Sequence, residues 1–183
     1  MYVIDIVIAV SWVAFWIYWL VASLGVKSGR TRWGRFAGSR VVIILVLLVG
    51  ARLKFFKGHH TVVTNPLLQG IGLVLVLLGL GLAIWARVYL GRNWGMPMTE
   101  KADPELVTTG PYGTIRHPIY SGLILALIGT TVAVSLYWLI AVAVLGGYFI
   151  YSAVMEERYM AGKFPETYPR YQHETKMLIP YLV

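Results

Sequence analysis

The stretch that decides the fold is Ile119–Met155, IYSGLILALIGTTVAVSLYWLIAVAVLGGYFIYSAVM, which contains no charged residue in 37 positions. About 20 apolar residues in a helix cross the roughly 30 Å hydrocarbon core of a bilayer. The stretch therefore has room for two membrane-spanning helices. The aromatic and polar residues at Ser135–Trp138 suit a tight turn at a membrane interface. We accordingly expect spans at 119–134 and 136–155.

Three more apolar segments precede this stretch, and we expect them to span the membrane at 2–24, 40–56 and 67–90. The first holds one charge, Asp5. A cleavable signal peptide is the alternative for that segment, but such peptides begin with positive charges, whereas here the positive cluster follows the apolar run. The second carries Arg52 and Lys54, which must reach an interface or face protein.

Glycines recur in the third span, at Gly70, Gly72, Gly79 and Gly81. Small residues in this kind of pattern let neighbouring membrane helices approach closely, so we interpret all four as helix-packing positions. Whether the same glycine faces also support a dimer is left open by the sequence.

The composition of the 183 residues agrees with a membrane protein. Hydrophobic residues make up 58% of the chain and charged residues 13%, about half the share of a soluble domain. We therefore predict one all-α, polytopic membrane domain over 1–183. The chain has no cysteine, which excludes disulfides, thiolate metal sites and a cysteine nucleophile. Four histidines and few carboxylates further argue against a structural zinc site, and we expect no metal.

The distribution of Lys and Arg predicts the orientation of the chain. Thirteen of the sixteen follow the first, third and fifth spans, and the other side receives Arg52, Lys54 and Lys57. The positive-inside rule then puts the N-terminus outside and the C-terminus in the cytoplasm. Anionic lipid headgroups account for the basic pI of about 9.8 without a nucleic-acid partner. The small size favours the cell membrane of a bacterium or an archaeon.

Two polar stretches, Gly91–Pro118 and Glu156–Val183, fall on the predicted cytoplasmic side. Each has 28 residues, too few for a doubly wound nucleotide-binding domain. Any functional site must therefore be built against the helix ends.

The first polar stretch ends with Arg116 and His117, directly before Pro118. A proline there suits the first turn of the fourth span, and the N-terminus of a helix attracts anions. The pair could thus form part of a binding site. Equally, Arg116 could be a snorkelling topology anchor and His117 an interfacial bystander.

The second polar stretch opens with Glu156 and Glu157, which we expect to lie straight after a charge-free helix. Like charges repel, and the end of a helix is the negative pole of its dipole, so a cationic partner is expected nearby. That partner could be a ligand with an ammonium or sulfonium group, or it could be structural. The structural candidates are Arg87, Arg116 and Arg158.

In order along the chain, these residues resemble the membrane-embedded methyltransferases that include isoprenylcysteine carboxyl methyltransferases and phospholipid N-methyltransferases. The resemblance covers about the C-terminal half, from Leu90 to Pro180. It rests on Leu90-Gly91-Arg92-Asn93-Trp94, Leu106-Val107-x-x-Gly110-x-Tyr112, Arg116-His117-Pro118-x-Tyr120-x-Gly122, Glu156-Glu157, Phe164-x-x-x-Tyr168-x-x-Tyr171 and Ile179-Pro180.

The resemblance implies that S-adenosylmethionine (SAM) is the cofactor. Its site would be made of cytoplasmic loops and the ends of the last two spans. By analogy, the adenosine part would meet the loop before the fourth span and the methionine part the start of that span, with Glu156 as a hydrogen-bonding partner. The cofactor-binding residues would be Leu106, Val107, Gly110, Tyr112, Arg116, His117, Pro118, Tyr120 and Glu156.

The resemblance also implies a lipophilic, amphipathic or prenylated acceptor for the methyl group. Isoprenylcysteine enzymes carry two arginines where this chain has Ser152 and Met177. A prenylcysteine carboxylate is therefore less expected than a lipid amine, a thiol or a hydroxyl. Ser152 and Trp94 are expected to contact the acceptor. An acceptor that must lose a proton would need a base, for which His117 and Glu157 are the candidates.

Two other classes of function compete with methyl transfer. A membrane protein of related architecture could bind a cofactor, a lipid or haem without catalysis, and His59 and His60 would be the residues to consider for haem. They lie on the predicted outer side, far from the motifs, where a polar loop explains them better. A transporter is disfavoured because the last two spans lack ionisable residues.

Overall fold

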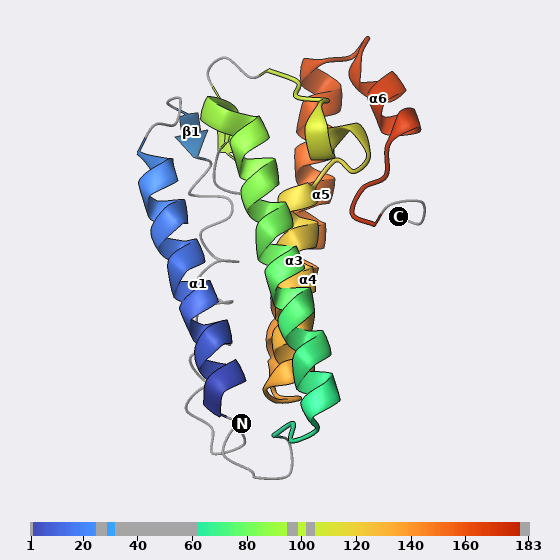
Figure 1. The fold of residues 1–183 in the computed structure, drawn as a ribbon. Coiled ribbons are helices and arrows are strands. Elements are labelled where there is room, and N and C mark those ends of the chain that lie inside the picture. The colour runs from blue at the N-terminus through green and yellow to red at the C-terminus, as the bar shows by residue number, and fades with distance from the viewer. Residues whose placement is uncertain (1, 25–28, 32–61, 95–98, 102–104, 180–183) are drawn as a thin grey trace.

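The computed structural model describes residues 2–24, 29–31, 62–94, 99–101 and 105–179. The regular elements in these residues are helices, apart from one short ribbon of two strands (Figure 1). The helices are α1 (Tyr2–Ser23), α3 (Pro66–Leu90), α4 (Pro118–Ala133), α5 (Trp138–Lys163) and α6 (Tyr168–Glu174), with 3-10 turns η3 (Gly91–Asn93) and η4 (Gly110–Gly113). The predicted span at 40–56 and the pair His59 and His60 lie outside the described residues.

Three of the described helices, α1, α3 and α5, are long and apolar enough to cross a membrane. The fourth, α4, is apolar but has 16 residues. The first, third and fourth spans begin and end within about one residue of the predicted positions. The chain is thus an integral membrane protein, as its hydropathy indicates.

The prediction that Glu156 and Glu157 follow the end of the last helix was wrong. Helix α5 continues to Lys163, eight residues beyond the expected end at 155. Glu156 and Glu157 therefore lie inside the helix, about two turns before its C-terminus. Hydropathy detects where a helix leaves the apolar layer, whereas Glu, Arg, Met and Ala continue a helix readily in water. Pro165 follows directly after the C-cap residue, Phe164, where it disfavours continuation.

The seam between α3 and α4 is a contact of backbone against backbone. A Cβ added at Gly79 would lie 2.5 Å from both Ala126 N and Gly122 O, closer than any real contact. The same holds for Gly72, which confirms these two glycines as packing positions. At Gly70 and Gly81 no described atom lies within 4 Å of an added Cβ, so for these two glycines the packing role stays a prediction.

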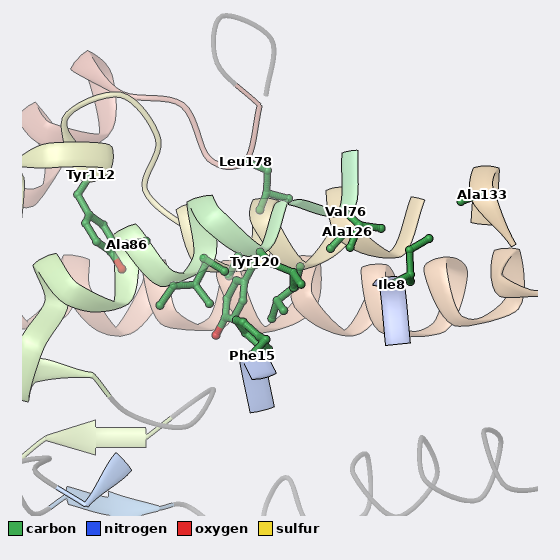
Figure 2. Close-up of a cluster of buried hydrophobic side chains, with 14 residues drawn as sticks. Ile8, Phe15, Val76, Ala86, Tyr112, Tyr120, Ala126, Ala133 and Leu178 are labelled. Atoms are coloured by element: carbon green, nitrogen blue, oxygen red, sulfur yellow. The ribbon is translucent and has the colours of Figure 1, made fainter. Parts of the chain in front are cut away.

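The apolar core lies between α1, α3 and α4 (Figure 2). Its central members include Ile8 and Phe15 of α1, Val76 and Leu80 of α3, and Leu123 and Ala126 of α4. The indole of Trp12 donates a hydrogen bond to Thr130 Oγ1 at 3.1 Å, which ties α1 to α4. These contacts hold α4 as the central helix, against which the polar segments are assembled.

The two ends of the bundle are closed differently. Near the start of α3, the Asn65 side chain caps the helix by accepting from Leu67 N, and Val63 N donates to Val134 O beyond α4. At the other end, strand β1 (Gly29–Thr31) pairs antiparallel with β2 (Thr99–Lys101). This ribbon brings the segment after α1 to the segment after α3, so both segments lie at the same end of the bundle (Figure 1).

Candidate functional site

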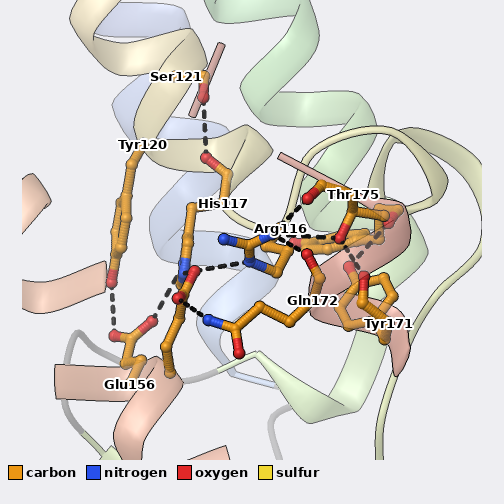
Figure 3. Close-up of polar contacts among 10 residues, drawn as sticks. Arg116, His117, Tyr120, Ser121, Glu156, Tyr171, Gln172 and Thr175 are labelled. Carbon is orange, nitrogen blue, oxygen red and sulfur yellow. Dashed lines mark hydrogen bonds and ion pairs between the residues drawn. The ribbon is translucent and has the colours of Figure 1, made fainter. Parts of the chain in front are cut away.

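A cluster of polar side chains lies where the start of α4 meets the polar part of α5 (Figure 3). Pro118 is the first residue of α4, as predicted, and places Arg116 and His117 at its entrance. Tyr120 follows in the first turn. These side chains face Glu156 and Glu157 of α5, so residues about 40 positions apart in sequence converge.

The cationic partner of Glu157 is Arg116. Its Nε donates to Glu157 Oε1 at 2.7 Å, and the two side chains are only 9% and 11% exposed. Gln172 Nε2 donates to the other oxygen, Glu157 Oε2, at 2.9 Å. Arg158, another structural candidate, is exposed and contacts Met155. Glu157 is therefore an ionised acceptor held from two sides.

Arg116 also fixes the segment that follows α6. Its Nη1 donates to Gln172 O at 3.0 Å and to Thr175 O, while its backbone N–H donates to Lys176 O at 2.8 Å. The neighbouring His117 N–H donates to Met177 O at 3.1 Å. The side chain of Arg116 is turned inward and is only 9% exposed, which argues against Arg116 as a snorkelling anchor.

The imidazole of His117 lies between the two carboxylates. Its Nδ1 is 3.6 Å from Glu156 Oε2 and its Nε2 is 3.4 Å from Glu157 Oε1. Nε2 is buried and makes no hydrogen bond of good geometry to any described residue. The ring stacks on Tyr120, which in turn stacks on Phe149. His117 is thus a part of the cluster, and the view of it as an interfacial bystander was wrong.

The two glutamates differ in how they are bound. Glu156 Oε1 accepts from Tyr120 OH at 2.6 Å, and its side chain is 29% exposed. Glu157 is bound by Arg116 and Gln172 and is 11% exposed. Glu157 therefore holds the structure together, whereas Glu156 is the carboxylate more accessible from outside.

Turn η4 borders the cluster on the side of the loop before α4. Gly110 has a φ of +60°, and a Cβ there would overlap the ring of Tyr89, so glycine is required. The carbonyl of Tyr112 accepts from Tyr171 OH at 2.7 Å. Burial raises the pKa of Tyr112, and it raises the pKa of Tyr171 to about 12. Both phenols are therefore neutral at physiological pH.

The remaining residues with predicted roles lie at the margin of the cluster or outside it. Leu106 and Val107 are half-buried in the extended segment that leads to η4. Ser152 is fully buried one turn before Glu156 on α5, and its hydroxyl donates to Tyr148 O. Trp94 lies elsewhere, because its ring contacts Trp19 of α1 and the guanidinium of the buried Arg87.

Three residues that contact the cluster were missed by the sequence reasoning, namely Gln172, Thr175 and Phe149. Gln172 and Thr175 belong to no recognisable motif, and their role depends on where α6 packs. An aromatic residue such as Phe149 in an apolar span is indistinguishable from a lipid-facing one. Among the described residues, no group of three or more His, Asp or Glu side chains is placed to hold a metal ion.

The fold and the cluster define a class: an integral membrane protein whose bundle of helices carries a largely buried polar site at one end. The model of the phospholipid methyltransferase family matches residues 68–167, which include η4, α4 and both glutamates. That match covers more than half of the chain, and the chain belongs to this family.

Individual relatives of the chain include two proteins named for metal resistance and one named as a methyltransferase. The chain is 31% identical over 148 residues to the cobalt-zinc-cadmium resistance protein of Cupriavidus metallidurans, and 26% identical over 143 residues to the nickel-cobalt-cadmium resistance protein of Alcaligenes xylosoxydans xylosoxydans. These matches cover 78% and 77% of the chain, but only 62% of either relative. It is also 27% identical over 147 residues to protein-S-isoprenylcysteine O-methyltransferase B of Arabidopsis thaliana, covering 77% of the chain and 72% of that protein.

Proposed function

We propose that this protein transfers the methyl group of SAM to a lipophilic or amphipathic acceptor at the membrane. The observation that carries the proposal is the convergence of Arg116, His117, Tyr120, Glu156 and Glu157 at one end of α4 and α5. These residues come from separate motifs and lie inside the region matched by the phospholipid methyltransferase family.

The chemistry of the cluster fits SAM. The cofactor carries an ammonium, a sulfonium and ribose hydroxyls, all of which a carboxylate can bind, and Glu156 is the accessible carboxylate. His117 Nε2 is a buried polar atom without a well-aligned partner among the described residues, and Tyr120 holds the Glu156 carboxylate by a hydrogen bond of 2.6 Å. We therefore assign Glu156, Tyr120 and His117 to cofactor binding. The segment Leu106–Tyr112, with Gly110, would meet the adenosine.

When bound, SAM supplies an electrophilic methyl group for an in-line displacement. The protein's own task is to orient the acceptor and to exclude water. An acceptor hydroxyl, ammonium or thiol must lose a proton. We propose that His117 Nε2 takes up this proton. Glu157, the other proposed base, already accepts from Arg116 and Gln172. Lying 3.4 Å from Nε2, it would stabilise the imidazole once protonated.

The orientation in the membrane is part of the proposal. We propose five spans within one domain over 1–183, with the site facing the cytoplasm of a bacterial or archaeal cell. The β1–β2 ribbon supports this arrangement, because it places two of the basic segments at the same end as the polar cluster. A lipophilic acceptor would then enter from the bilayer while SAM enters from the cytoplasm.

The class of acceptor depends on whether the site offers a cation that could bind a carboxylate. Arg116 is engaged by Glu157 and by carbonyls of the C-terminal segment. Ser152, which stands at the position of a family arginine, is buried and bonded to its own helix. Neither offers a cation to an acceptor carboxylate, which favours a lipid amine, thiol or hydroxyl over a prenylcysteine carboxylate. Screening lipid extracts with labelled SAM would identify the product.

The first test is calorimetric binding of SAM to the detergent-purified protein. We expect micromolar binding by the wild type and its loss in His117→Ala and in Glu156→Ala. Glu174→Gln is the matched control, since Glu174 forms only an exposed ion pair with Arg170 on α6. A folded wild-type protein that fails to bind SAM would refute the proposed function.

A further inference from the structure

Helix α6 carries two neighbouring residues whose side chains reach two different elements of the site (Figure 3). Tyr171 OH donates to Tyr112 O of η4 at 2.7 Å. Gln172 Nε2 donates to Glu157 Oε2 of α5 at 2.9 Å. One short helix thus contacts both the loop before α4 and the carboxylate that faces His117.

Arg116 fixes the position of α6 through the carbonyls at the C-terminal end of this helix. Carbonyls near the C-terminus of a helix lack partners within the helix and form the negative pole of its dipole. Arg116 Nη1 donates to two carbonyls there, Gln172 O and Thr175 O. Its Nε holds Glu157 at the same time. The guanidinium therefore links α6, the entrance of α4 and the polar part of α5.

The hydrogen bond made by Tyr171 is buried, so its loss would leave a buried carbonyl without this donor. Tyr171 is 8% exposed and packs edge-on against Tyr168. Without the phenol, the carbonyl of Tyr112 would lose the donor that satisfies it. Gln172, by contrast, is exposed, so its side chain can be changed without opening a cavity. The position of α6 can therefore be tested by substituting one buried residue, Tyr171, and one exposed residue, Gln172.

We propose that Tyr171 and Gln172 are positioning residues, through which α6 holds η4 and the Glu157 carboxylate in register with His117. The geometric part of this proposal is that α6 holds Glu157 in place beside His117. The functional part, an effect on SAM binding, rests on the proposed function. Neither residue touches the reacting atoms. Glu157 lies 3.4 Å from His117 Nε2, so movement of this carboxylate changes the electrostatic environment of the imidazole directly.

The geometric part is tested without cofactor by nitrogen NMR of histidine-labelled protein in detergent, with the His117 signals assigned through His117→Ala. We expect Gln172→Ala to shift the His117 Nε2 resonance. Gln172→Glu is nearly isosteric but puts a second carboxylate where the donor was, and it should shift the resonance at least as far. Glu174→Gln, on the same helix, should leave it unchanged. An unmoved Nε2 resonance in Gln172→Ala would overturn the proposal.

The functional part is tested by SAM calorimetry on the same variants. We expect Gln172→Ala and Tyr171→Phe each to raise the Kd about threefold to tenfold, the effect of one hydrogen bond. Gln172→Ala should keep the melting temperature of the wild type. If the wild type binds SAM and both variants bind it equally well, the positioning role is refuted while the proposed function stands. If the wild type does not bind SAM but the Nε2 resonance moves, the positioning role stands and the proposed function fails.

Discussion

Helix α4 meets α3 along its length through glycines and small residues, whereas its first turn meets α5 through charged and aromatic side chains. At Gly79 and Gly122 the two backbones touch, and an added Cβ has no space. At Arg116 and Glu157 the backbones are kept apart, and a hydrogen bond of 2.7 Å joins the side-chain ends. The same helix is thus packed by shape in one region and by polar bonds in the other.

This difference indicates which positions of the protein tolerate amino-acid substitution. Along the α3–α4 seam any larger side chain must separate the helices, because backbone atoms cannot yield locally. In the polar cluster the contacts are made by side-chain ends, and Glu157 accepts from two donors, so removing one side chain alters the chemistry before it alters the fold. Substitutions in the seam should therefore act on stability, and substitutions in the cluster mainly on binding.

The most damaging change should be Gly79→Val in the seam. Its methyl groups would collide with Ala126 N and Gly122 O, and we expect a loss of about 3 kcal/mol in the free energy of unfolding. Thermal unfolding followed by circular dichroism in detergent would measure it. Gly81→Val is the control on the same helix, because no described atom lies near that position. Equal melting temperatures of the two variants would contradict the close packing.

A smaller loss is expected for Arg116→Ala, the one substitution in the cluster that should also affect stability. It leaves the Glu157 carboxylate without its cation, at a cost of about 2 kcal/mol, less than for a fully buried pair because both side chains are about 10% exposed. The segment after α6 should become sensitive to protease. Arg158→Ala removes an exposed arginine of α5 and should have no such effect. Protease resistance equal to that of the wild type would show that Arg116 does not hold this segment.

Tyr120→Phe should affect binding and leave the fold intact. The variant keeps the stacked ring but loses the hydrogen bond to Glu156, worth about 1 kcal/mol, so SAM affinity should fall about fivefold. Calorimetry with Tyr89→Phe as the control, an exposed tyrosine of α3, would measure this. A melting temperature that falls as far as in Gly79→Val would remove the contrast between the two regions.

The mildest effect is a dependence on alkaline pH. Burial raises the pKa of Tyr171 from 10.0 to about 12, so the fold favours the neutral phenol. The stability that Tyr171 contributes is complete below pH 10 and is lost as the pH rises from about 10 to about 12. Tyr171→Phe cannot ionise, so its melting temperature should fall less than that of the wild type in this window. Parallel curves for the two proteins would contradict the buried phenol.

The glycines show how far a sequence pattern can predict packing. Gly72 and Gly79 are seven residues apart, two helical turns, and therefore share a stripe that faces α4. Gly70 and Gly81 fit a small-residue pattern equally well, but no described atom packs against them. A pattern identifies residues that permit close approach, whereas the partner helix determines which of them are used.

The end of α5 shows a similar limit for the site. Apolar length predicts where a span crosses the bilayer, because the thickness of the hydrocarbon layer fixes it. It does not predict the eight further residues to Lys163, which carry Glu156 and Glu157 on helical backbone. The motifs indicated that these glutamates belong with Arg116 and His117. They did not indicate that Glu157 would be held by Arg116 and Gln172 and that Glu156 would stay accessible.

The sequence alone determined the membrane character of the chain, the position of most described spans and the grouping of Arg116 and His117 with Glu156 and Glu157. These follow from local properties, namely apolar length, charge and ordered motifs. Only the tertiary structure decided which glycines form the seam and that α6 reaches both η4 and Glu157. It also decided that Glu156 lies near Nδ1 of His117 and Glu157 near Nε2. The physical reason is that these contacts join segments tens of residues apart, and their partners depend on how the helices pack.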